Sequence, residues 1–267
     1  MDPGAVERVQ ISSGSVAFRR AGDGPVLLLL HGFLCDSRVW REQLDLADRF
    51  TVVAWDAPGA GGSSDPPEGS TIGDWARQLA EFFDAVGIER AHVLGLSWGG
   101  LLAQSFYTAY RSRVSSLVLA DTYAGWRGSF GSQIADQRLE RCERDASLPV
   151  DRFVQAWVPQ FFTDAAPPEL VEEMSTIVSS FHPSGFRMMA RTLAETDSTE
   201  LLATIAVPTL LLWGEDDRRS PLEVAEAFRD RIPHAQLQVI PGAGHVSNME
   251  QPDRFNADVA HFCASAR

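Results

Sequence analysis

The sequence has 267 residues, which is enough for one large domain or for one domain that carries an insertion. Its 45% hydrophobic and 22% charged residues are typical of a soluble globular protein. The 36 acidic residues outnumber the 23 lysines and arginines, so the net charge is −13. Because this charge repels polyanions and no basic cluster breaks the pattern, nucleic acid and anionic membranes are excluded as expected partners.

The cysteines and the apolar runs indicate the cellular compartment in which the protein is expected. Cys35, Cys142 and Cys263 are odd in number, widely spaced and without a CxxC pair, which favours a reducing compartment over a disulfide framework or a zinc site. Residues 1–10 contain acidic side chains and no apolar centre, so we expect no signal peptide. The longest apolar run, "PVLLLL", is too short to span a bilayer. We therefore expect a cytoplasmic monomer or homodimer that acts on a small molecule.

Short strand-like runs alternate with longer helix-like runs along the chain. The first two strand-like runs alternate in polarity and predict a half-exposed antiparallel hairpin. Later runs such as "VLLLL" and "TLLLW" are apolar throughout, as strands are when helices cover both faces of a parallel sheet. The expected strands lie at 8–12, 15–20, 26–30, 51–55, 91–96, 114–120, 209–213 and 236–240.

The helix-like runs between them have helical spacing. Apolar residues within "TIGDWARQLAEFFDAVG" fall near one face, and Gly87 is expected to end that helix. In "SPLEVAEAFRDRIP", Ser220 is a candidate N-cap and Pro221 suits the first helical position. The alternation predicts an α/β fold with a mostly parallel eight-stranded sheet, right-handed crossovers and flanking helices.

The alternation fails between residues 122 and 203. This segment has no convincing central strand and contains three short helix-like pieces, broken at "SLPVD", "TDAAPPE" and "FHPSG". Large apolar side chains are frequent in it, and the sheet pattern resumes directly afterwards with "VPTLLLWG". We interpret 122–203 as a helical insertion in a core formed by 1–121 and 204–267.

A serine flanked by glycines follows one of the expected strands. The pentapeptide Gly95-Leu96-Ser97-Trp98-Gly99 matches G-x-S-x-G, with a strand before it and a helix after it. Such a sharp turn strains the serine backbone and leaves no room for side chains at 95 and 99, which glycine resolves. The turn lifts the Ser97 hydroxyl above the sheet at a helix N-terminus, where it can act as a nucleophile.

A serine nucleophile needs a base, and there are six histidines. His245 is favoured because it lies on a glycine-rich loop after the last strand, where a parallel sheet carries its reactive groups. His92 and His261 fall inside a strand and a helix, while His182 and His234 adjoin prolines in the insertion and in a turn. An imidazole base predicts that activity falls as the pH drops through roughly 6–7.

An acid must orient the imidazole, and the residues alone leave four candidates. Glu215, Asp216 and Asp217 follow one strand, and Asp121 follows an earlier strand. Each lies between Ser97 and His245 in the chain, so the order Ser–acid–His holds for all of them.

Two backbone amides can complete the chemistry by holding a negative oxygen. The "HGF" turn after the strand at 26–30 brings the Phe33 amide toward Ser97, and the Trp98 amide is the second donor of this expected oxyanion hole. His31 is expected to be structural, bonding to nearby backbone. The loop "DAPGAGGSSDPP" has no lysine after its glycines, so we interpret it as a rigid border of the site rather than a phosphate cradle.

These blocks resemble the α/β-hydrolase fold superfamily over nearly the whole length of the chain. The matching stretches are "HGF", "DAPGAGGSS", "GLSWGG", "VPTLLLWGEDDRRSP" and "GAGHVSNMEQPDRF". The resemblance implies Ser97 as nucleophile, His245 as base and Phe33 and Trp98 as oxyanion donors. Its G-x-x-D-x-x-x-P pattern, at Gly214, Asp217 and Pro221, implies Asp217 as the acid. It also implies that 122–203 is a cap over the site.

The expected activity is hydrolysis of a carboxylic ester or lactone through an acyl-enzyme, without metal or organic cofactor. Similarity to enol-lactonase-like and small carboxylesterase members is closest, especially over 195–217. The cap aromatics suggest an apolar or aromatic group in the substrate, although large apolar side chains usually serve packing. The expected pocket residues are Trp126, Trp157, Phe161, Phe162, Met188 and Val246.

Other activities of the same fold stay open or are disfavoured by single residues. A C–C bond hydrolase or lyase could use the same triad, and a non-catalytic ligand receptor could keep the fold. Ser97 argues against epoxide hydrolases and haloalkane dehalogenases, which use an aspartate. Leu34 stands where haloperoxidase and perhydrolase relatives usually have proline, and "HGFLC" departs from the "HGGPG" loop of prolyl iminopeptidases. Glu169, Glu172 and Glu173 could bind a substrate amine but are typical of a solvated helix face.

Overall fold

A computed structural model describes residues 5–266 of the chain. The expectation that residues 1–10 form no signal peptide rests partly on residues 1–4, which lie outside this range. Within the described range, no helix combines the length and apolar character needed to cross a membrane. Cys35, Cys142 and Cys263 are all buried and free, and burial raises the pKa of each thiol to about 12.

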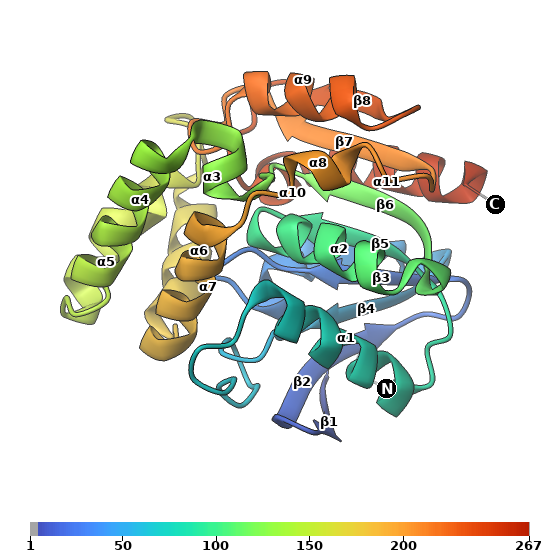
Figure 1. Ribbon diagram of the computed structural model, residues 1–267, viewed down its shortest axis with the longest axis horizontal. Helices are drawn as coiled ribbons and strands as arrows, with labels where there is room; N and C mark the ends of the chain where they lie inside the picture. The colour runs from blue at the N-terminus through green and yellow to red at the C-terminus, as the bar shows by residue number, and fades with distance from the viewer. Residues whose placement is uncertain (1–4, 267) are drawn as a thin grey trace.

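A mostly parallel sheet organises the molecule (Figure 1). Its eight strands within residues 5–266 follow the order β1-β2-β4-β3-β5-β6-β7-β8. The β1–β2 and β2–β4 pairs are antiparallel, and all other neighbours are parallel. The expected hairpin and the eight-stranded α/β sheet are therefore confirmed. The strands are β1 (Val6–Ile11), β2 (Gly14–Ala21), β3 (Val26–Leu30), β4 (Thr51–Trp55), β5 (Ala91–Leu96), β6 (Val114–Ala120), β7 (Thr209–Gly214) and β8 (Gln236–Ile240).

Helices cover both faces of this sheet. In Figure 1, α1 and α2 lie in front of the strands and α11 lies behind them, where it packs against the 3₁₀ stretch η1. Thr71 and Asp74 form a capping box at the start of α1, and Gly87 ends that helix with φ of 74°, as expected. The core helices are η1 (Ser37–Asp48), α1 (Ile72–Val86), α2 (Trp98–Ala109), η2 (Arg111–Arg113), α9 (Leu222–Arg231), α10 (Ser247–Glu250) and α11 (Pro252–Ser265).

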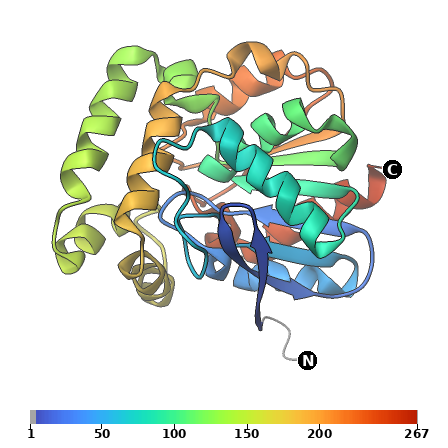
Figure 2. The same cartoon turned by 60° about the horizontal axis from the view of Figure 1, so that its bottom comes forward.

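The segment between β6 and β7 is entirely helical and forms a separate layer beside the carboxyl ends of the strands (Figures 1 and 2). It has more helices than the three pieces expected, because Gly131 at φ of 80° divides the first stretch and short turns follow others. We call this layer the cap. Its helices are α3 (Gly125–Phe130), α4 (Ser132–Asp145), α5 (Val150–Trp157), η3 (Val158–Gln160), α6 (Pro168–Ser179) and α7 (Pro183–Glu195), while the short α8 (Thr199–Leu202) that follows packs against α2 and α9 of the core (Figure 1).

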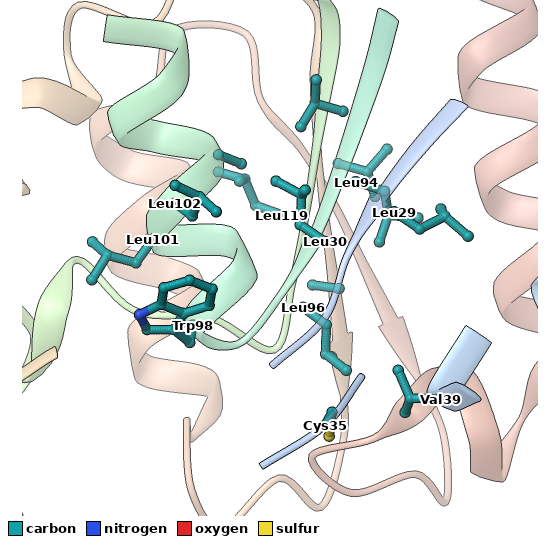
Figure 3. Close-up of a cluster of buried hydrophobic side chains, with 14 of the residues drawn as sticks. Leu29, Leu30, Cys35, Val39, Leu94, Leu96, Trp98, Leu101, Leu102 and Leu119 are labelled. Atoms are coloured by element: carbon teal, nitrogen blue, oxygen red, sulfur yellow. The ribbon is translucent and has the colours of Figure 1, made fainter. Parts of the chain in front are cut away.

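One buried hydrophobic core joins the sheet to its helices. Figure 3 shows part of it, where Leu30 of β3, Leu94 of β5 and Leu119 of β6 gather with Trp98 and Leu102 of α2. The apolar strands are buried on both faces, which explains why their sequences show no alternation.

The expected start of the helix after β7 is wrong by one residue. Pro221 precedes α9, which begins at Leu222. Ser220 cannot cap this helix, since its hydroxyl donates to the Thr122 carbonyl at 2.6 Å. Its amide donates to Asp217 at 3.0 Å, so Ser220 joins the β7 loop to the end of β6 instead.

Candidate active site

The turn between β5 and α2 has the geometry that its glycines require. Ser97 has φ of 54° and ψ of −117°, a strained conformation for a residue with a side chain. A Cβ on Gly95 would lie 2.3 Å from the Gly99 carbonyl oxygen, and one on Gly99 would lie 2.1 Å from the Leu30 oxygen. Thr122 also holds the turn by donating its hydroxyl to the Ser97 carbonyl at 2.5 Å. The turn therefore presents the Ser97 hydroxyl at the carboxyl end of β5.

Three loops bring Ser97, His245 and Asp217 together. The Ser97 Oγ lies 2.9 Å from Nε2 of His245, and Nδ1 of His245 lies 2.8 Å from Oδ2 of Asp217. With the Nδ1 proton donated to the carboxylate, Nε2 is free to accept the serine proton. This arrangement has the connectivity of a nucleophile, a base and an orienting acid.

The other three acid candidates do not reach the imidazole. Asp217 also accepts hydrogen bonds from the amides of Arg219 and Ser220, at 2.8 and 3.0 Å, which fix its carboxylate. Asp121 instead accepts from the Gly214 amide at 2.8 Å and the Ser247 hydroxyl at 2.5 Å. Glu215 and Asp216 are exposed. Among the described residues, Asp217 is the carboxylate hydrogen-bonded to His245.

Burial sets the protonation of the imidazole. It lowers the pKa of His245 below 6.5, and this effect exceeds the opposing influence of the Asp217 charge and hydrogen bond. The positive charges of Arg219 and Arg138 lower the pKa further. His245 is therefore neutral at pH 7, as a general base must be.

The two segments that carry the expected oxyanion donors lie next to the serine. Trp98 is the first residue of α2, where backbone amides have no partner within the helix. A Cβ on Gly32 would lie 3.2 Å from Cβ of Ser97, so the loop after β3 passes directly beside the serine. Phe33 follows on this loop, and Leu34 has φ of 65°, which marks a sharp bend there.

His31 has the structural role that the sequence suggested. Its Nδ1 lies 2.7 Å from the Gly32 carbonyl oxygen, and its Nε2 accepts from the Ala57 amide at 3.0 Å. It therefore ties the loop after β3 to the loop after β4. The latter loop borders the cap, because a Cβ on Gly59 would lie 2.9 Å from Cα of Gly185 in α7.

The cap covers this constellation closely. Ser97 and His245 are each 2% exposed. Phe161 stacks on the His245 ring with 6.2 Å between ring centres. The expected pocket residues Trp126, Trp157, Phe162 and Val246 are buried, whereas Met188 is half-buried at the core surface.

The sequence reasoning missed the arginines near the site. Arg219 is 8% exposed, and its guanidinium lies over the rings of Phe33 and Phe161 at 5.3 and 5.2 Å. Arg138 of α4 donates to the Arg219 carbonyl at 3.2 Å. Arg219 stands two residues after Asp217, which was the available signal, but arginines in a charged loop usually face solvent.

Within residues 5–266, no group of three or more histidine, cysteine or acidic side chains is arranged to hold an ion.

Known proteins resemble this chain in both sequence and structure. The sequence profile of the alpha/beta hydrolase fold matches residues 25–252. A 3-oxoadipate enol-lactonase of Acinetobacter baylyi is 27% identical, over 88% of this chain and 86% of its own. A putative carbamate hydrolase of Azorhizobium caulinodans is 31% identical, over 91% of this chain and 92% of its own.

Among solved structures, a thermophilic esterase from Thermogutta terrifontis with malate bound has a TM-score of 0.89 and 31% identity. That match covers 98% of this chain and 99% of the esterase chain. The profile match, the sheet order and the strained serine turn agree with one another. The chain therefore belongs to the α/β-hydrolase fold family, and it is a hydrolase.

Proposed function

We propose that this protein hydrolyses a carboxylic ester or lactone of a small substrate, with Ser97, His245 and Asp217 as its catalytic triad. The observation that carries the proposal is the buried hydrogen-bonded chain from Ser97 Oγ through His245 to Asp217, with contacts of 2.9 and 2.8 Å. The likeness to an enol-lactonase and to an esterase supports hydrolysis of a lactone or an ester.

The reaction proceeds in two halves. His245 Nε2 removes the Ser97 proton as Oγ attacks the carbonyl, and the amides of Phe33 and Trp98 hold the oxyanion of the tetrahedral intermediate. The imidazolium then protonates the leaving alcohol or enol, which leaves the acyl-enzyme. Water, deprotonated by His245, attacks the acyl carbon and releases the acid. Asp217 keeps the imidazole in the correct tautomer and stabilises its positive form throughout.

In this proposal the segment 122–203 is a mobile cap domain on a core formed by 1–121 and 204–267. The supporting observation is the burial of the Ser97 hydroxyl beneath it. Its apolar lining, including Trp126, Trp157 and Phe161, contacts the apolar part of the substrate.

A panel of nitrophenyl esters of increasing chain length and of lactones of increasing ring size tests the proposal, with Ser97→Ala as the blank. We expect turnover of at least one member that is lost in Ser97→Ala by a factor of about 10³ or more. Turnover at the same rate in both proteins would contradict it. Turnover of vinylogous diketones alone would instead assign C–C bond hydrolysis.

A further inference from the structure

A small cavity of arginines and indoles lies against the candidate active site. Its volume is about 150 Å³. The residues that line it include four arginines and two tryptophans, namely Arg138, Arg141, Arg218, Arg219, Trp126 and Trp157. The chain carries a net charge of −13, so four arginines around one cavity stand out against the rest of the molecule.

Two of these arginines have no acidic partner. Arg141 pairs with Asp145 at 3.3 Å, and Arg218 pairs with Asp164 at 3.0 Å. Arg138 and Arg219 have no carboxylate within 4.0 Å among residues 5–266. Burial lowers the pKa of the Arg138 guanidinium from its ordinary value, as loss of water does for a positive charge.

The polar atoms of Arg219 are also incompletely satisfied. Its Nη1 donates to Gln160 Oε1 at a long 3.4 Å, and its Nε is buried without a hydrogen-bond partner. The indole N–H groups of Trp126 and Trp157 are likewise buried and unpartnered. Buried donors and charges without partners are costly, and the cation–π contacts of Arg219 with Phe33, Phe161 and Trp157 offset only part of that cost.

The guanidinium groups without an acidic partner and the N–H donors without a hydrogen-bond partner together suit a carboxylate ligand. Guanidinium groups bind carboxylates through paired, charge-assisted hydrogen bonds, and an indole N–H can add a third donor. The cavity volume fits a carboxylate group and a short piece of the chain that carries it. An acidic side chain of the protein would have satisfied Arg138 and Arg219 permanently, yet none of the described carboxylates pairs with either of them.

The cavity is one aromatic ring away from the triad. The Arg219 guanidinium carbon lies 5.2 Å from the centre of the Phe161 ring, and the same ring stacks on the His245 imidazole. Arg219 also lies over the ring of Phe33, on the expected oxyanion loop, with its guanidinium carbon 5.3 Å from the ring centre. An anion bound by Arg219 therefore belongs to the end of the substrate remote from the reacting carbonyl.

We propose that Arg138 and Arg219 bind a carboxylate of the substrate, so that the enzyme acts on monoanionic esters or lactones whose carboxylate is several bonds from the scissile carbonyl. The inference rests on the proposed function and names its substrate class.

The kinetic test compares mono(4-nitrophenyl) glutarate with its neutral methyl ester, because the two differ in one negative charge. We expect kcat/KM of the wild type to be about tenfold or more higher for the anion, mainly through KM. Arg138→Gln and Arg219→Gln should lose this preference. Arg144→Gln is the matched control, since Arg144 lies on the same helix and its side chain is 68% exposed. Arg138→Lys keeps the charge and should retain part of the preference.

A binding test separates this inference from the proposed function. Calorimetry with Ser97→Ala should detect saturable glutarate binding that disappears in Ser97→Ala/Arg138→Gln and survives in Ser97→Ala/Arg144→Gln. If no ester or lactone is turned over but glutarate binds in this pattern, the proposed function fails and the carboxylate site stands.

Three results would overturn the inference while leaving ester hydrolysis intact. The first is equal kcat/KM for the charged and neutral glutarates in the wild type. The second is a preference that persists in both glutamine variants. The third is tighter binding of inorganic phosphate than of glutarate by Ser97→Ala, which would make the cavity a phosphate site.

Discussion

Two buried aspartates at neighbouring strand ends have different hydrogen-bond partners and different roles in the structure. Asp217 contacts the His245 imidazole, whereas Asp121 joins the Gly214 amide to the Ser247 hydroxyl. Burial, followed by the Asp217 charge, raises the pKa of Asp121 well above 3.8. Asp121 thus links the β7 loop that carries Asp217 to the β8 loop that carries His245, without touching either catalytic side chain.

This difference predicts the outcome of two substitutions. Asp121→Asn keeps an acceptor for Gly214 and a donor toward Ser247 and removes the cost of a buried carboxyl with a raised pKa, so the free energy of unfolding at pH 7 should stay the same or rise. Asp121→Ala leaves the buried Gly214 amide unpaired and should lower the free energy of unfolding by about 1–3 kcal/mol. Urea unfolding measures both variants. Equal losses in the two would show that the hydrogen bonds of Asp121 do not stabilise the fold.

The lowered pKa of His245 predicts where activity is lost as the pH falls. The neutral imidazole is the active base, and burial keeps it neutral below pH 6.5. The fall in kcat/KM on acidification should therefore have its midpoint below 6.5, whereas the sequence alone suggests roughly 6–7. A pH series with a neutral nitrophenyl ester measures this midpoint. A midpoint above 6.5 would mean that burial does not control the pKa of this histidine.

At the scale of single residues, the sequence supported some assignments much better than others. Ser97 and His245 could be proposed because a glycine-flanked serine turn and a glycine-rich loop each limit what the residue can do. Four carboxylates satisfied the chain order, and local chemistry could not separate them, since distance to the imidazole is a tertiary property. Arg138 and Arg219 were missed for the same reason, because nothing local indicates that a guanidinium will be buried against aromatic rings.

Among the elements, the loop after β8 is held by the cap through one side chain. Glu250 accepts from the Gly244 amide at 2.6 Å, and from the amide and hydroxyl of Thr163 at 2.9 and 2.7 Å. The Val246 amide donates to the Phe161 carbonyl at 3.3 Å. Glu250 therefore fixes the loop of His245 to the cap residues that follow η3.

Removing this carboxylate should misplace the base. We expect Glu250→Ala to lower kcat/KM for a neutral ester by about tenfold or more, because small displacements of a catalytic group are costly. Glu226→Ala, on the exposed face of α9, is the control and should have no effect. Unchanged kcat/KM in Glu250→Ala would show that the His245 loop holds its own shape.

At the scale of elements, strands were easier to predict than cap helices. The runs at 26–30, 51–55, 91–96, 114–120 and 236–240 match β3, β4, β5, β6 and β8 residue for residue. Burial on both faces makes the apolar runs of β3 to β6 distinctive, whereas β8 alternates between exposed and more buried residues. The cap helices lack that signal, since their division depends on turns such as the one at Gly131 and on packing against α7. No helix was expected over the η1 stretch, although one set of its side chains is buried.

The whole molecule contains three buried neutral histidines. Burial lowers the pKa of His31, His92 and His245 below 6.5. The unfolded chain therefore binds more protons than the native protein just below pH 6.5, and stability falls as the pH drops through that window. Each unit of lowered pKa corresponds to about 1.4 kcal/mol. The raised pKa of Asp121 acts in the opposite direction, because the native state keeps that proton as the pH rises.

Urea unfolding at pH 7.5 and 5.5 checks this balance. We expect the urea concentration at the unfolding midpoint to be lower at pH 5.5 than at pH 7.5. The decrease should be larger in Asp121→Asn, because that variant lacks the carboxyl whose raised pKa opposes the effect of the histidines. His234 is exposed, so His234→Gln should leave the pH dependence unchanged. A higher midpoint at pH 5.5 in the wild type would mean that the histidines do not dominate acid stability.

The claim on which the proposed mechanism depends is that Ser97 is an activated nucleophile. Intact-mass spectrometry after treatment with a fluorophosphonate probe measures this directly. We predict one covalent adduct per wild-type chain, mapped to Ser97, none in Ser97→Ala, and much slower labelling in His245→Ala. Equal labelling of the wild type and Ser97→Ala, or no labelling of either, would contradict the account.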